Sequence, residues 1–145
     1  EKLNRNNIAL KIVGKLEDLP AELQELIMDV IESTKNNTGL VLTLALSYGG
    51  RQEIVDAINK IITSDNKRID EEIFKNYLYA PTMPDPDLII RTGGENRLSN
   101  FLLWQSAYSE IYVSKKNWPE FAEDDLISAL NDFGQRKRKY GKVLS

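Results

Sequence analysis

The segment RTGGENRLSN, residues 91–100, contains the densest group of phosphate-binding residue types in this sequence. It holds two arginines, two glycines and a serine between two apolar runs. A guanidinium presents a rigid fork of N–H donors that matches phosphate oxygens two at a time. Glycine lets backbone N–H groups come close to an anion. A phosphate or diphosphate ligand would account for all of these residue types together.

Single residues of this segment also have structural explanations. Ser99 can cap a short helix, and Arg97 can form a surface ion pair with Glu95. The glycines can simply form a turn. Taken one at a time these explanations are the simpler ones, so the prediction of an anion site depends on the segment as a whole.

Arg91 is harder to explain by structure alone. It ends the apolar run 88–90, where a buried strand is expected to emerge from the core. A guanidinium in that position needs an anionic partner. Asp85, Asp87 or a bound ligand could supply it.

Glu110 is the candidate metal ligand. It follows the predicted helix at 101–104 and precedes the next apolar run, so it could return to the edge of the sheet where Arg91 emerges. Magnesium usually takes one or two carboxylates together with phosphate oxygens and water, so one glutamate is sufficient. A solvated carboxylate is the alternative. These residues predict an anion site but do not identify a reaction.

The elements on either side must position these side chains. Short β-rich apolar runs alternate with segments that carry apolar residues at helical spacing. Such alternation is typical of an α/β fold with a mostly parallel sheet covered by helices on both faces. Strands are predicted at 8–13, 40–46, 87–90 and 111–113, and helices at 23–31, 54–62, from Asp70 onward, at 101–104 and at 126–133.

A second glycine loop contains Tyr48, Gly49, Gly50 and Arg51. Ligands of open α/β sheets gather at the carboxyl ends of the strands, and this loop follows a predicted strand. The glycines permit a tight turn, and Arg51 falls in the first turn of the next helix. A plain turn with a solvated arginine explains the loop equally well.

The composition excludes several classes of function. The chain has 145 residues, which fits one domain, and a net charge of −3, so we expect no attraction to nucleic acid. It has no cysteine and no histidine, which excludes disulfides, thiolate chemistry and zinc or triad catalysis. No apolar run is long enough to span a bilayer, and we interpret the chain as cytoplasmic. Because residue 1 is Glu, we expect the chain to begin within a longer protein.

Two longer strings resemble characteristic blocks of the cis-prenyltransferases, in particular those of the undecaprenyl diphosphate synthase type. The strings are LALSYGGRQEIVDA and DLIIRTGGENRLSNFLLWQSAYSEIYV. The second match continues without gaps through Trp118, Pro119 and Phe121. The resemblance covers the whole chain and implies the α/β fold of that family, with its N-terminal part missing.

The resemblance implies an enzyme that condenses isopentenyl diphosphate with an allylic diphosphate, typically farnesyl diphosphate. The product would be a long polyprenyl diphosphate such as undecaprenyl diphosphate, the lipid carrier for cell-wall glycans. Mg²⁺ would be the cofactor, and the protein would form a homodimer. Since the product is a membrane lipid, peripheral contact with a membrane stays open.

The resemblance also assigns roles to the residues of the two loops. Arg91, Arg97 and Ser99, with the backbone around Leu98, would hold the diphosphate of isopentenyl diphosphate. Roles outside this set are implied for three residues: magnesium ligation for Glu110, a place near the metal and diphosphate for Glu95, and structural support of the site for Arg51.

The sequence departs from the family pattern in several places. The family's N-terminal block, whose aspartate assists departure of the allylic diphosphate, is absent from these residues. Ser47 replaces the common asparagine before Tyr48, and Lys139 and Tyr140 stand where arginine and phenylalanine are frequent. We therefore interpret residues 1–145 as the C-terminal portion of a single cis-prenyltransferase domain, inactive alone. The alternative is a noncatalytic diphosphate-binding or partner subunit.

The basic ending RKRKYGK, residues 136–142, has two interpretations. In the family such a tail can reach toward the active site of the partner subunit. Basic residues at a helix C-terminus also interact favourably with the helix dipole. The sequence favours neither interpretation.

Overall fold

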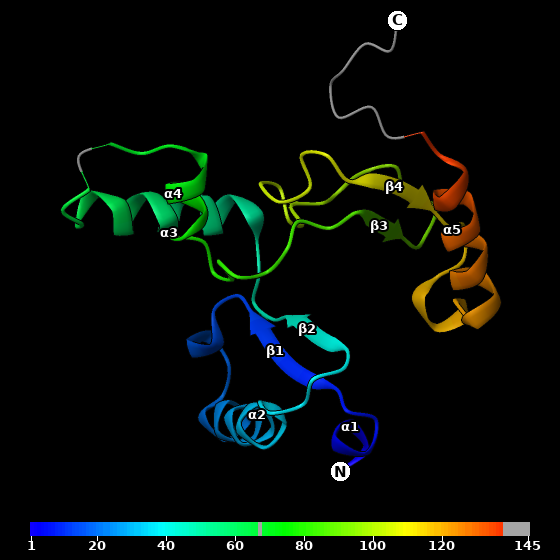
Figure 1. Ribbon diagram of the computed structural model, residues 1–145, viewed down its shortest axis with the longest axis horizontal. Helices are drawn as coiled ribbons and strands as arrows, with labels where there is room; N and C mark the ends of the chain where they lie inside the picture. Colours follow the sequence, from blue (N-terminus) through cyan, green and yellow to red (C-terminus); the bar gives the residue numbers. More distant parts are fainter. Residues whose placement is uncertain (67, 138–145) are drawn as a thin grey trace, which may run out of the picture. The chain divides into compact units, whose positions relative to one another are not determined.

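The computed structural model describes residues 1–66 and 68–137, and the chain divides into two compact units, Glu1–Thr82 and Met83–Ser145. Each unit contains one pair of parallel strands accompanied by helices (Figure 1). This arrangement confirms the predicted α/β class with parallel strands. Lys139 and Tyr140, in the predicted basic tail, lie outside the described residues. The interpretation as part of a single domain stays a prediction.

The first unit is built around β1 (Ala9–Val13) and β2 (Val41–Ala45), which pair in parallel. Both strands fall where the apolar runs predict them. Asp70 caps a short helix as expected, because its Oδ1 accepts a hydrogen bond from Ile73 N at 2.9 Å. The helices of this unit are α1 (Lys2–Arg5), α2 (Ala21–Thr34), α3 (Gly50–Ile62) and α4 (Glu71–Lys75), with a 3-10 turn at Leu16–Asp18.

Two buried contacts fix β1 against its neighbours. Thr34, at the end of α2, accepts a hydrogen bond from Leu10 N at 3.1 Å and donates one to Val30 O at 2.8 Å. Gly14 follows β1 with a φ of +120°, and a Cβ there would lie 2.0 Å from Leu46 O. Only glycine allows the ends of β1 and β2 to approach this closely.

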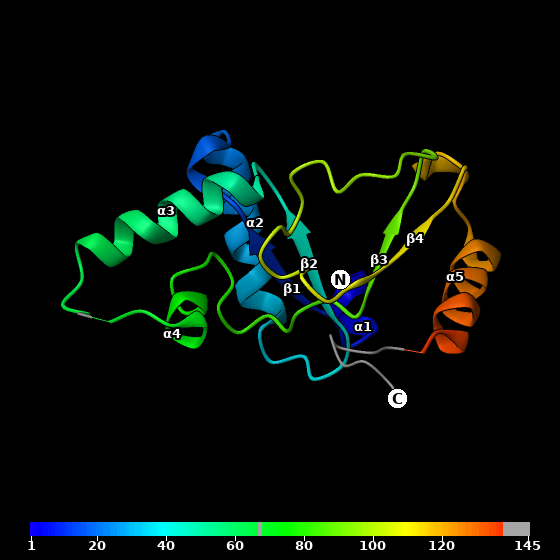
Figure 2. The same cartoon turned by 90° about the horizontal axis from the view of Figure 1, so that it is seen from above.

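The second unit contains β3 (Leu88–Arg91) and β4 (Glu110–Val113), which also pair in parallel. A 3-10 turn at Trp118–Glu120 leads into α5 (Glu123–Gln135). α5 lies next to β4 in both views (Figures 1 and 2). Both strands and α5 confirm the prediction from the apolar pattern.

The short helix predicted at 101–104 is wrong. The chain forms turns there, and Ser99, Asn100 and Leu102 have φ angles of +49°, +65° and +46°. A right-handed helix requires a φ of about −63° at each residue, so this backbone cannot be helical. Ser99 therefore does not act as the N-cap of a helix.

The surface of the first unit differs from the expectation of fully covered strands. Val41, Leu42 and Leu44 of β2 are between 38% and 50% exposed. Among the described residues, β2 has β1 as its one hydrogen-bonded neighbour, which leaves its side chains partly open. Across residues 1–66 and 68–137, none of the helices has both the length and the apolar character that membrane crossing requires.

Candidate anion-binding site

The loop after β3 is fastened to the chain that follows β4. Ser114 N donates to Arg91 O, Gly93 N donates to Lys116 O, and Gly94 N donates to Ser114 O, each at 2.8 Å. Gly93 and Gly94 have φ angles of +86° and +74°, which favour glycine. The fold already uses both glycine N–H groups, so these residues supply backbone conformation rather than donors to an anion.

Arg91 ends β3 with an unsatisfied donor. Its Nε is buried and has no hydrogen-bond partner within the part of the chain that the structure describes. No ion pair joins Arg91 to Asp85 or Asp87 there, so neither aspartate is the anionic partner that the sequence requires. A buried donor left unpaired costs about 1–3 kcal/mol, which an anion bound at this end of the strand would recover.

Arg97 and Glu95 form the surface ion pair that the sequence offered as the simpler explanation. Arg97 Nη1 lies 2.6 Å from Glu95 Oε2, and the two side chains are 61% and 50% exposed. Exposed pairs of this kind contribute about 0–1 kcal/mol. A diphosphate could therefore draw Arg97 away from Glu95 at little energetic cost.

The backbone after Leu98 is conformationally strained. Ser99, Asn100 and Leu102 all adopt positive φ, which is uncommon outside glycine and rare for a bulky residue such as leucine. Leu102 is 8% exposed, so packing of its side chain helps to hold this conformation. Such outliers cluster at ligand-binding segments, where the strain is part of the preorganisation.

Glu110 begins β4 and is held by Arg136, which follows α5. Arg136 Nη1 lies 2.9 Å from Glu110 Oε2, and each side chain is 30% exposed. The alternative of a purely solvated carboxylate is therefore wrong. The hydrogen bond to Glu110, followed by the one to Asp132, raises the pKa of Arg136 above its usual value, so the guanidinium stays charged.

Arg91 and Glu110 lie at opposite ends of the strand pair. Leu88 pairs with Glu110 and Arg91 pairs with Val113. Glu110 and Arg91 are therefore three residues apart along the strand direction, or about 10 Å. Side chains alternate between faces, so Glu110 shares a face with Leu88 and Ile90 while Arg91 points to the other. The sequence predicted that Glu110 lies at the same edge of the sheet as Arg91. Within one chain this prediction is wrong.

Glu110 nevertheless has the chemistry of a single-carboxylate metal ligand. Within residues 1–66 and 68–137, no three Asp, Glu, His or Cys side chains gather into a metal-ligating group. Magnesium does not need such a group when phosphate oxygens and water complete its shell. Arg136 donates its hydrogen bond to Oε2 of Glu110, and no residue of the described chain donates one to Oε1. The role of Glu110 as a metal ligand stays a prediction.

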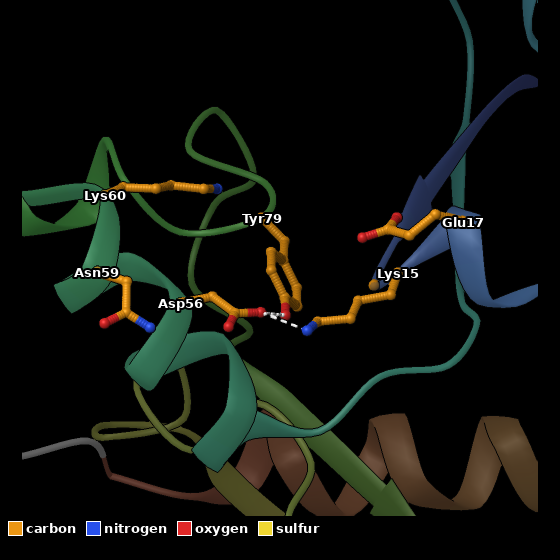
Figure 3. A pocket seen from close by; sticks show the side chains of 7 residues that line it. Lys15, Glu17, Asp56, Asn59, Lys60 and Tyr79 are labelled. Atoms are coloured by element: carbon orange, nitrogen blue, oxygen red, sulfur yellow. Dashed lines mark hydrogen bonds and ion pairs between the residues drawn. The ribbon is translucent and has the colours of Figure 1, made fainter. Parts of the chain in front are cut away.

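A second polar cluster lies in the first unit, around a cavity of about 460 Å³ (Figure 3). Lys15 Nζ lies 3.0 Å from Asp56 Oδ2, and the Tyr79 hydroxyl donates to the same oxygen. Lys60 Nζ lies 5.6 Å from the centre of the Tyr79 ring. The lining residues are Gly14, Lys15, Glu17, Asp56, Asn59, Lys60 and Tyr79.

The charges of this cluster satisfy one another. The hydrogen bond from Tyr79, followed by the one from Lys15, lowers the pKa of Asp56 to about 2. Burial, followed by the hydrogen bond to Asp56, raises the pKa of Tyr79. The hydrogen bond to Asp56 also raises the pKa of Lys15. The hydrogen bond from Tyr79 and the ion pair with Lys15 stabilise the ionised Asp56, so we interpret the cluster as a structural feature of the first unit.

The turn before α3 is held by a buried carboxylate. Glu53 is fully buried and accepts hydrogen bonds from Tyr48 OH at 2.6 Å and from Tyr79 N at 3.1 Å. Arg51 lies exposed in the first turn of α3, as predicted from the glycine loop. Its supporting role toward the anion site stays a prediction.

Sequence reasoning missed Arg136 and Glu53. Arg136 belongs to the basic tail in the sequence, and nothing in its neighbours indicates a contact with Glu110 on another element. Glu53 had a usable signal, because an acidic residue in the first turn of a helix is favoured by the helix dipole. Its complete burial and its hydrogen bonds from Tyr48 and Tyr79 had no such signal.

Comparison with known protein sequences gives strong matches along the whole chain. The Prenyltransf family model, described as "Putative undecaprenyl diphosphate synthase", matches residues 1–141. An isoprenyl transferase of Rickettsia felis is 53% identical over 140 residues, covering 97% of this chain and 60% of that protein. An isoprenyl transferase of Thermotoga maritima is 46% identical over 149 residues, covering 100% of this chain and 64% of that protein. The chain thus spans less than two thirds of the length of these curated relatives.

Solved structures share the fold. A crystal structure of a probable undecaprenyl diphosphate synthase from Campylobacter jejuni matches with a TM-score of 0.87 and 38% identity, covering 97% of this chain and 66% of that one. Lavandulyl diphosphate synthase from Lavandula x intermedia, in complex with dimethylallyl diphosphate, matches with a TM-score of 0.89 and 37% identity. The match covers 93% of this chain and 61% of that one.

Proposed function

Because the chain belongs to the undecaprenyl diphosphate synthase family of prenyltransferases, we propose that the complete protein condenses isopentenyl diphosphate with an allylic diphosphate. A carbon–carbon bond forms between the allylic carbon and isopentenyl diphosphate, the allylic diphosphate leaves, and a proton is lost. Farnesyl diphosphate is the proposed allylic substrate. The proposed product is a long polyprenyl diphosphate such as undecaprenyl diphosphate, a lipid carrier for cell-wall glycans.

The observation that carries this proposal is the unpaired donor of Arg91. A buried guanidinium Nε without an acceptor among the described residues is the feature expected of a site built for an anion. Its position at the carboxyl end of β3 is where ligands of α/β folds gather. A diphosphate oxygen at this position would satisfy it.

Arg97, Ser99 and the backbone around Leu98 would complete diphosphate recognition. Arg97 would exchange its exposed pair with Glu95 for phosphate oxygens. Ser99 would donate its hydroxyl, and the strained backbone after Leu98 would hold both side chains in place. Glu95, released from Arg97, would stay beside the bound diphosphate.

The proposed cofactor is Mg²⁺, with Glu110 as its ligand. A divalent cation bound to the diphosphates would neutralise the negative charge that grows on the leaving group. Glu110 and Arg91 lie at different ends of the strand pair. We therefore do not propose that a metal on Glu110 contacts the diphosphate held by Arg91 of the same chain. The homodimer and the cytoplasmic location implied by the family resemblance stay predictions.

Arg97→Ala in the complete protein tests the assignment. Loss of a charge-assisted hydrogen bond costs about 1.5–3 kcal/mol, so the KM for isopentenyl diphosphate should rise roughly ten- to hundredfold. Arg5→Ala is a matched control, because Arg5 is also exposed and paired, with Glu1 at 2.9 Å in the first unit. An unchanged KM in Arg97→Ala, or an equal rise in Arg5→Ala, would count against the proposal.

A second experiment addresses the isolated chain. We propose that residues 1–145 alone do not turn over, because the aspartate block that the family uses for the allylic diphosphate is not in this sequence. Labelled isopentenyl diphosphate should enter polyprenyl product with the complete protein and not with residues 1–145. Incorporation by neither would favour a noncatalytic subunit, and incorporation by residues 1–145 would contradict the proposal of an inactive portion.

A further inference from the structure

Arg136 connects the end of α5 with the start of β4. Its Nη1 donates to Glu110 Oε2 at 2.9 Å and to Ile111 O at 3.0 Å. Its Nε donates to Asp132 Oδ2 at 2.8 Å, one helical turn before it. Bonds to two elements fix the guanidinium plane, and the plane in turn fixes the carboxylate of Glu110.

The two oxygens of Glu110 are therefore not equivalent. Oε2 is committed to Arg136, whereas no residue of the described chain donates to Oε1. The side chain is 30% exposed, so solvent reaches part of it. A carboxylate held at one oxygen loses little conformational entropy when the other oxygen binds a metal.

We propose that Arg136 is a positioning residue for Glu110, holding one carboxylate oxygen so that the other presents to a divalent cation. This inference rests on the proposed function, in which Glu110 is a metal ligand. Groups that hydrogen-bond to metal ligands commonly change metal affinity by about 10–100-fold when they are removed. Arg136 occupies this place relative to Glu110.

The sign of the effect separates positioning from simple charge. By Coulomb attraction alone, removing the positive charge of Arg136 would strengthen binding of a cation at Glu110. Loss of positioning would weaken it. A fall in metal affinity after removal of Arg136 therefore cannot come from the change in charge.

The test is a titration with Mn²⁺ of the complete protein carrying one equivalent of isopentenyl diphosphate, following free Mn²⁺ by electron paramagnetic resonance without any turnover. Arg136→Gln should weaken Mn²⁺ binding roughly tenfold or more, and Arg136→Lys should recover part of it. Lys116→Gln is the matched control, because Lys116 also joins the chain after β4 to α5, through Asp125 at 2.8 Å. That variant should bind Mn²⁺ as the wild type does. Circular dichroism checks that each variant is folded.

Glu110→Gln distinguishes failure of the inference from failure of the proposed metal site. If Glu110→Gln binds Mn²⁺ like the wild type, or if the wild type binds none, Glu110 is not a metal ligand and both proposals fall. If Glu110→Gln weakens binding but Arg136→Gln leaves it unchanged or strengthens it, the inference alone is overturned. An equal loss in Lys116→Gln would overturn it as well, because a general effect of fastening α5 would then explain the data.

Discussion

The polar cavity of the first unit and the loop after β3 contain similar side chains but use them in opposite ways. In the cavity, Lys15 and Tyr79 both bond to Asp56, so that each charge or hydroxyl has a partner. In the loop, Arg91 keeps a buried donor without a partner among the described residues, and Arg97 has one exposed ion pair. The charges of the cavity pair within the fold, whereas the loop keeps a buried donor that the described fold does not use.

This contrast separates a perturbed pKa from a functional site. Perturbed groups often mark active sites, but structural ion pairs shift pKa values as well. The lowered pKa of Asp56 and the raised pKa of Tyr79 belong to a self-satisfied cluster. The loop is marked instead by an Arg91 donor without a partner among the described residues and by the positive φ of Ser99.

The largest expected effect is on stability in the first unit. Glu53→Ala removes a fully buried carboxylate that accepts from Tyr48 OH and Tyr79 N. Loss of these two hydrogen bonds, together with the cavity left by a fully buried side chain, should lower the free energy of unfolding by about 3–5 kcal/mol. Denaturant unfolding of the complete protein measures this loss.

Glu95→Ala is the matched control in the loop. The Glu95 side chain is 50% exposed, and its ion pair with Arg97 is a surface pair. Its removal should change the free energy of unfolding by less than about 0.5 kcal/mol. If both glutamate variants lost the same stability, the contrast between the two regions would be wrong.

The next effect is on ligand affinity in the loop. Arg91→Gln removes the unpaired Nε, so the protein should be no less stable while binding isopentenyl diphosphate about ten- to hundredfold more weakly. Calorimetric titration gives the affinity, and thermal unfolding gives the stability. A large loss of stability with unchanged affinity would assign Arg91 to the fold instead.

A smaller effect is the acid sensitivity of the cavity. The pKa of Asp56 is about 2 in the folded protein against 3.8 unfolded, so its contribution is fully present above about pH 4 and is lost as the pH falls toward 2. The side chain is 21% exposed, and solvent screening reduces the contribution to about 1–2 kcal/mol. Asp56→Asn should remove this part of the pH dependence of the free energy of unfolding. An unchanged acid dependence in the variant would show that Asp56 is not responsible.

The last effect concerns the backbone of the loop. Gly94 has a φ of +74°, and the nearest atom to an added Cβ would be Lys115 Cα at 3.8 Å, which leaves enough space. Gly94→Ala should therefore cost only the left-handed strain, about 1–2 kcal/mol, and Gly94→Asn should cost less. Thermal unfolding of both variants checks this order. A larger cost for asparagine would indicate a steric role for Gly94.

Periodicity was sufficient to predict most elements of the fold. β3 was expected at 87–90 and spans Leu88–Arg91, since its apolar run is flanked by prolines and glycines. The turn at Ser99, Asn100 and Leu102 could not be predicted, because serine and leucine normally prefer negative φ and tertiary contacts impose the other sign.

The positions of the candidate residues in the fold were predicted in part, and their roles stay predictions. The arginine loop at the end of β3 is where the sequence indicated it. The position of Glu110 was predictable from topology, because the residue that begins a parallel strand lies at the amino end of the sheet and Arg91 lies at the carboxyl end. The bond between Glu110 and Arg136 joins separate elements and had no local signal.

The most direct measurement is an amide NMR titration of the complete protein with isopentenyl diphosphate. It compares the two regions in one experiment. We expect the largest shifts at residues 95–100, beside Arg97 and Ser99, with the signals of Lys15 and Tyr79 unchanged. Largest shifts at Lys15, Lys60 and Tyr79, with residues 95–100 unaffected, would contradict the claim that the loop after β3 binds the diphosphate.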